Sequence, residues 1–80
     1  MNVARINWAL RVAQDARTAL SDLADVMDEM GTEADRNPGA AADAASLIAR
    51  AEEARGAARL LTEWMGHFRR LQERAGSGGG

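Results

Sequence analysis

The chain has 80 residues, of which 46% are hydrophobic and 28% charged; this composition is typical of one small globular domain and excludes a disordered chain. It contains no cysteine, which excludes a disulfide framework and a thiolate metal site. The net charge of −2 gives no support for general nucleic-acid binding. The sequence has no apolar run of roughly 20 residues, so we expect a cytoplasmic protein that does not enter a membrane.

A first helix is predicted from Val3 to Met30. Asn2 precedes it and can cap its amino terminus, because its side-chain oxygen can accept a backbone N–H. Gly31 is expected to end this helix, since glycine adopts the left-handed conformation at low steric cost. With Val3 at heptad position a, apolar residues occupy positions a and d and also c and g, an arc of about 160°. This arc is wider than contact with one other helix requires.

Two residues of the first helix do not fit its apolar pattern. Trp8 falls at position f among acidic residues, which leaves two interpretations: burial against the end of the second helix, or an anchor for a binding partner. Arg17 falls at position a, in the middle of the apolar stripe. It either extends its charge to the edge of the interface or forms an ion pair with Asp43 or Glu53 of a second chain.

The turn is predicted at residues 31–37, and the second helix is predicted from 38 to about 75. Asn37 and Pro38 are a helix-start signal, with asparagine as the cap and proline at the first helical position. The glycine-rich segment 76–80 is expected to be a flexible tail outside the fold. The sequence therefore predicts an all-α protein with one domain over residues 1–75, an antiparallel two-helix hairpin.

The second helix has a narrow, alanine-rich apolar stripe in its first half and a bulkier one in its second half. Gly56 and Gly66 interrupt it, and their usual explanation is close backbone approach or a bend. A single hairpin would leave several large apolar side chains in water, so we expect a homodimer that forms a four-helix bundle. The alternative is a groove for a helix of another protein. The expected dimer interface consists of Leu20, Leu23, Met27, Met30, Leu60, Trp64 and Arg17.

The charges are distributed unevenly along the chain. Residues 18–53 contain nine Asp and Glu but two Arg, whereas the rest of the chain contains eight Arg and three acidic residues. A hairpin places the basic segments at one end and the acidic segments at the other. The candidate partner-binding residues are therefore Trp8, Arg5, Arg11, Arg69, Arg70 and Arg74 at the basic end, and Asp25, Asp28 and Glu29 in the acidic segment.

No pattern of catalytic or metal-binding residues is recognisable. His67 is the one histidine; Glu63 lies four residues before it, but a metal site needs more ligands than these two. No Ser or Thr has a base at a recognisable spacing. We therefore expect a protein that is not an enzyme and has no cofactor.

In its small size, its helicity and its lack of a catalytic motif, the chain resembles phage-encoded inhibitors of bacterial defence such as anti-CRISPR proteins. The resemblance implies a host protein or nucleoprotein complex as partner and occlusion of its nucleic-acid-binding surface as the action. One alternative is a small nucleic-acid-binding or regulatory protein that uses the Arg-rich end. Another is a structural or adaptor hairpin completed by a different subunit.

Overall fold

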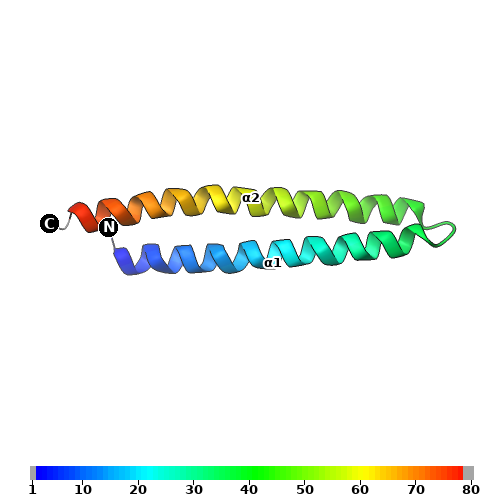
Figure 1. Ribbon diagram of the computed structural model, residues 1–80, viewed down its shortest axis with the longest axis horizontal. Helices are drawn as coiled ribbons and strands as arrows, with labels where there is room; N and C mark the ends of the chain where they lie inside the picture. Colours follow the sequence, from blue (N-terminus) through cyan, green and yellow to red (C-terminus); the bar gives the residue numbers. More distant parts are fainter. Residues whose placement is uncertain (1, 79–80) are drawn as a thin grey trace.

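The computed structural model describes residues 2–78 and contains two helices, α1 (Val3–Asp35) and α2 (Ala41–Gly78), joined by residues 36–40. The helices run antiparallel and side by side as a rod with extents of 65 × 14 × 11 Å (Figure 1). We call the end where α1 begins and α2 finishes the open end, and the other the turn end. The predicted all-α antiparallel hairpin is confirmed. Neither helix contains, within residues 2–78, a stretch long and apolar enough to cross a membrane.

The amino terminus of α1 is capped as the sequence predicts. The Oδ1 atom of Asn2 accepts hydrogen bonds from the backbone N–H of Ala4 at 2.9 Å and of Arg5 at 3.3 Å. Asn2 itself has extended backbone angles, which is the usual conformation of a capping residue. The cap satisfies two of the N–H groups that the first turn of a helix leaves without partners.

The prediction that Gly31 ends the first helix is wrong, because α1 continues to Asp35. Gly31 is buried against α2: a Cβ atom at this position would lie 3.1 Å from Ile48 Cγ1 and 3.3 Å from the carbonyl oxygen of Ala44. Glycine normally weakens a helix by about 1 kcal/mol relative to alanine. Here its missing side chain lets α2 approach closely, and that contact explains why the helix passes through it.

The turn is therefore at residues 36–40 and not at 31–37, and α2 starts at Ala41 and not at residue 38. The residue before a proline is disfavoured in the helical conformation, so Pro38 separates the two helices instead of starting the second. Gly39 reverses the chain with a φ of 89°, a value that favours glycine. At the other end α2 continues past residue 75 to Gly78, so 76–78 are helical and the rest of the predicted tail, 79–80, lies outside the described residues.

Small residues fill the seam between the helices. A central cluster contains Ala24, Ala51 and Ala54, with Leu20 and Met27 packed against it. Six of the eight buried hydrophobic residues are alanine, so the helices lie close together but remove little apolar area from water. The buried set is Ile6, Ala13, Ala24, Ala44, Ala51, Ala54, Ala58 and Met65.

The rod exposes more surface than a compact protein of its mass. Its accessible surface is 5665 Å², whereas a compact monomer of 8.5 kDa exposes about 4,700 Å². The excess of about 1,000 Å² is close to the area that one partner contributes to a typical protein–protein interface.

Candidate interaction surface

Many large apolar side chains of this hairpin lie outside its seam. Trp8 is 63% exposed and Trp64 is 53% exposed, although tryptophan is normally well buried in a folded domain. Most of the fully buried residues of the seam are alanine, so many large apolar side chains remain in contact with water. The exposed large hydrophobic residues are Val3, Trp8, Val12, Leu23, Val26, Met30, Ile48, Leu60 and Trp64.

The polar contacts between the two helices lie on one side of the hairpin. The Nη1 atom of Arg17 donates to Thr62 Oγ1 at 3.3 Å, and the side-chain amide of Gln72 donates to Asn7 Oδ1. With Val3 at position a of α1 and Ala44 at position a of α2, the seam is formed by positions a and d. The contacting residues occupy positions a, b and e, and we call this side the polar flank.

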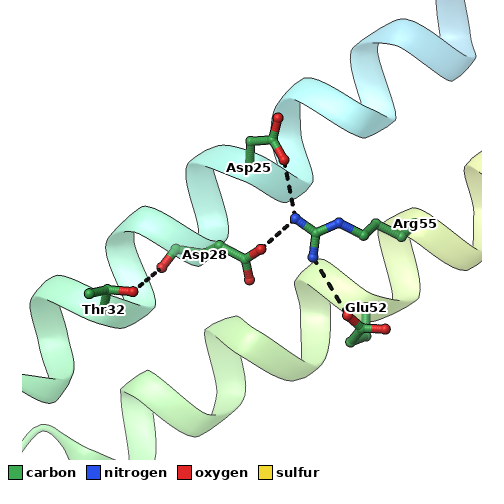
Figure 2. A network of polar contacts seen from close by, with 5 residues as sticks. All are labelled: Asp25, Asp28, Thr32, Glu52 and Arg55. Carbon is green, nitrogen blue, oxygen red and sulfur yellow. Dashed lines mark hydrogen bonds and ion pairs between the residues drawn. The ribbon is translucent and has the colours of Figure 1, made fainter.

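A network around Arg55 is the centre of the polar flank (Figure 2). The guanidinium of Arg55 forms ion pairs with Asp28, with Asp25 at 3.1 Å and with Glu52 on its own helix at 3.6 Å. The hydrogen bonds to Asp28 and then to Asp25 raise the pKa of Arg55 above its usual value. Asp25 and Asp28 were predicted to bind a partner; the structure instead engages both with α2, whereas Glu29 is exposed.

The opposite side of the hairpin exposes most of the large apolar side chains, although Arg50 and Glu53 of α2 form an exposed ion pair there at 2.8 Å. Positions c and g of both helices face away from the polar flank, because they lie on the other side of the a/d seam. We call this surface, with the residues listed here, the apolar flank: Val12, Leu23, Val26 and Met30 of α1 together with Leu60 and Trp64 of α2. Towards the open end the surface continues into a depression lined by Asn2, Arg5, Ile6, Ala9, Phe68 and Leu71.

The structure divides the predicted dimer interface. Leu23, Met30, Leu60 and Trp64 are exposed on the apolar flank, where a second chain can reach them. Leu20 and Met27 pack against the alanine cluster, so we place them in the seam and not on the outer surface. Arg17 is partly buried and also donates to Gln14 Oε1 at 2.8 Å, so its guanidinium is held inside the hairpin by neutral partners.

Trp8 projects away from the hairpin. It lies at position f, which is opposite the seam, between the two flanks. The interpretation that α2 buries it is wrong, because it is the most exposed of the large hydrophobic residues. Trp64, in turn, is not part of the hairpin core.

The predicted basic residues gather at the open end but do not form one face. All five are exposed. Their heptad positions place Arg5 and Arg74 on the apolar flank, Arg11 and Arg69 on the polar flank, and Arg70 on the outer side of α2. The five arginines therefore do not form a single basic patch on one face of the rod.

His67 is exposed, and its ring centroid lies 6.3 Å from that of Phe68. Within residues 2–78, no group of three or more His, Asp or Glu side chains is placed to hold a metal ion. Comparison with protein-family models, with curated protein sequences and with solved structures gives no match to this chain.

Proposed function

We propose that this protein works by binding and not by catalysis, as a homodimeric inhibitor that occludes a surface of a macromolecular target. The observation that carries the proposal is the set of large apolar side chains left exposed by a hairpin whose fully buried residues are mostly alanine. A contiguous apolar surface of this size on a small protein marks an interaction site.

Two separate parts of the surface support two contacts. The apolar flank suits self-association, because covering its large side chains supplies the burial that the alanine seam lacks. Trp8 lies away from the centre of that flank and stays available to another molecule. Tryptophan and arginine are the residue types most enriched among interface hot spots, and Arg5 and Arg11 lie within a turn of Trp8 on α1.

The class of target comes from the resemblance to phage-encoded anti-defence proteins. We propose a CRISPR-type nucleoprotein complex whose nucleic-acid-binding surface is blocked by the dimer. The turn end, with acidic residues such as Glu29 and Asp35 exposed, supports contact with a basic groove.

The experiment compares three tagged proteins in capture from the source bacterium: wild type, Trp8→Ala and Ile48→Ala. Ile48 is a matched control, since it is an exposed apolar residue on the polar flank, far from Trp8. We expect wild type and Ile48→Ala to retain the same protein, and Trp8→Ala to bind the purified target at least tenfold more weakly.

Three outcomes contradict the proposal. Equal binding by Trp8→Ala excludes Trp8 as the anchor. Direct binding of purified nucleic acid that weakens steeply with salt, and is lost in an Arg69→Glu/Arg70→Glu double variant, supports the nucleic-acid alternative instead. A chain that stays folded only together with a different subunit supports the adaptor alternative.

A further inference from the structure

We infer that the apolar flank is covered by a second copy of this chain, stacked antiparallel about a two-fold axis that passes next to Ala19 of α1 and Leu60 of α2. This inference rests on the proposed function and gives its self-association a defined register. In this arrangement α1 packs on α1 of the second copy, α2 packs on its α2, and each open end lies over the turn end of the other chain.

The c positions of α1 read almost the same in both directions. Arg5, Val12, Ala19, Val26 and Glu33 follow each other at intervals of seven residues. When two such helices pack antiparallel with Ala19 at the centre, Val12 faces Val26 of the second copy, and Arg5 faces Glu33. Small residues meet at the axis, valines lie on both sides, and opposite charges face each other at the ends.

The c positions of α2 are less symmetric, but around Leu60 they place no like charges opposite each other. Seven residues on either side of Leu60 lie Glu53 and His67, and seven residues further lie Ser46 and Arg74. In the antiparallel stack Glu53 faces His67 of the second copy, which places an acidic group opposite the one histidine. Trp64, at position g, faces Ala57 of the second copy, so the largest side chain of this helix meets a small one.

Ala19 and Leu60, the centres of the two patterns, lie at the same height along the rod. The hydrogen bonds between Arg17 and Thr62 and between Asn7 and Gln72 give the same register between the helices. In that register Ala19 is level with Leu60, since each is displaced by two residues from the first pair. One two-fold axis can therefore pass next to both residues, which is the condition for both helices to pack symmetrically at once.

The area is sufficient for a stable dimer. The segment from residue 5 to residue 33 is about 42 Å long at 1.5 Å per residue, and two adjacent helices are about 20 Å wide. This gives roughly 800 Å² per chain, the size of a standard specific interface. The figure is close to the excess surface of the single hairpin, about 1,000 Å².

The charges select the antiparallel arrangement over the parallel one. The open half, residues 2–19 and 60–78, contains six Arg and three acidic residues, whereas the turn half, residues 20–59, contains four Arg and nine acidic residues. Antiparallel stacking places each basic half on an acidic half. The alternative two-fold axis, along the rod, would place like charges together at both ends.

The test uses single cysteines, because the natural chain has none. Ala19→Cys is expected to form a disulfide-linked dimer under mild oxidation, since its two copies meet at the axis. Thr18→Cys is the matched control: it is the adjacent exposed residue at the same height, but position b places it on the polar flank. Val12→Cys and Val26→Cys are expected to cross-link only when the two variants are mixed.

The outcomes separate the register from the proposed function. Cross-linking of Ala19→Cys and of the Val12→Cys/Val26→Cys mixture, with Thr18→Cys remaining monomeric in the gel, supports the inference. Cross-linking of Val12→Cys with itself, or no cross-linking of Ala19→Cys in a sample that sediments as a dimer, overturns this register but leaves self-association standing. A sample that sediments as a monomer overturns both, whereas target capture through Trp8 is measured independently.

Discussion

Gly31 of α1 lies so close to Ile48 of α2 that a Cβ atom on residue 31 would stand 3.1 Å from Ile48 Cγ1. This contact allows the helices to approach near the turn end, where the seam consists of small residues. Gly31 is therefore required for close packing of the helices, whereas Gly56 is not.

Substitution of Gly31 by valine is expected to reduce the free energy of unfolding by about 1–3 kcal/mol, because the added side chain collides with Ile48 and the carbonyl group of Ala44. Gly56→Ala is the matched control: its nearest neighbour would be the flexible side chain of Arg59 at 3.8 Å. It is expected to stabilise the protein by about 0.5–1 kcal/mol through helix propensity. Urea unfolding followed by circular dichroism, at one fixed protein concentration, measures both; a neutral Gly31→Val would show that the contact is not tight.

Arg55→Gln is expected to destabilise the hairpin, since it leaves Asp25 and Asp28 near each other without their shared cation. The loss is expected to be smaller than that of Gly31→Val, and to shrink at high salt, because these side chains remain partly exposed to solvent. A double-mutant cycle of Arg55→Gln with Asp28→Asn measures the coupling between the two groups. Additive effects of the two substitutions would show that the ion pair contributes nothing to stability.

Asn2→Ala is expected to remove the cap of α1 and to cost about 1 kcal/mol, because the N–H groups of Ala4 and Arg5 lose their acceptor. Amide hydrogen exchange measures the effect locally: exchange is expected to accelerate in the first turn and to remain unchanged near residue 24. Unchanged exchange at residues 4 and 5 would contradict the capping role.

The two tryptophans report on association separately. Trp64 lies on the apolar flank, whereas Trp8 points away from the seam between the two flanks. In a Trp8→Phe variant, dilution is expected to shift the remaining emission to longer wavelength as Trp64 becomes exposed to water. In a Trp64→Phe variant the shift is expected to be much smaller. A larger shift from Trp8 than from Trp64 would mean that the chains associate through another surface.

The helical periodicity was sufficient to predict the hairpin and the position of its apolar stripe, since seam residues such as Ala24 and Ala51 follow the heptad spacing. The turn was misplaced because a glycine signals a helix end by its local conformational freedom, and sequence does not show that α2 approaches Gly31. Pro38 and Gly39, a few residues later, were the stronger signal. Gly56 and Gly66, for which a close approach or a bend was expected, have only flexible arginine side chains nearby at 3.8 Å.

Part of the apolar flank could also be predicted from the heptad pattern. The excess of apolar residues at positions c and g of the first helix indicated side chains outside the seam, and Leu23 and Met30 are indeed exposed. The network of Arg55 does not follow from the pattern of either helix alone, because it depends on the register between the two helices. In an antiparallel pair, e positions face each other, and Asp28 and Arg55 both occupy position e.

The central claim is that the large apolar side chains on the apolar flank require a second chain to cover them. Sedimentation equilibrium over a wide concentration range tests this claim most directly. We predict a mass of twice 8.5 kDa for wild type and 8.5 kDa for Val26→Glu. Thr18→Glu is the control, because Thr18 is exposed at position b on the opposite flank, and this variant is expected to remain a dimer. A folded wild-type protein with a mass of 8.5 kDa at every concentration would contradict the account.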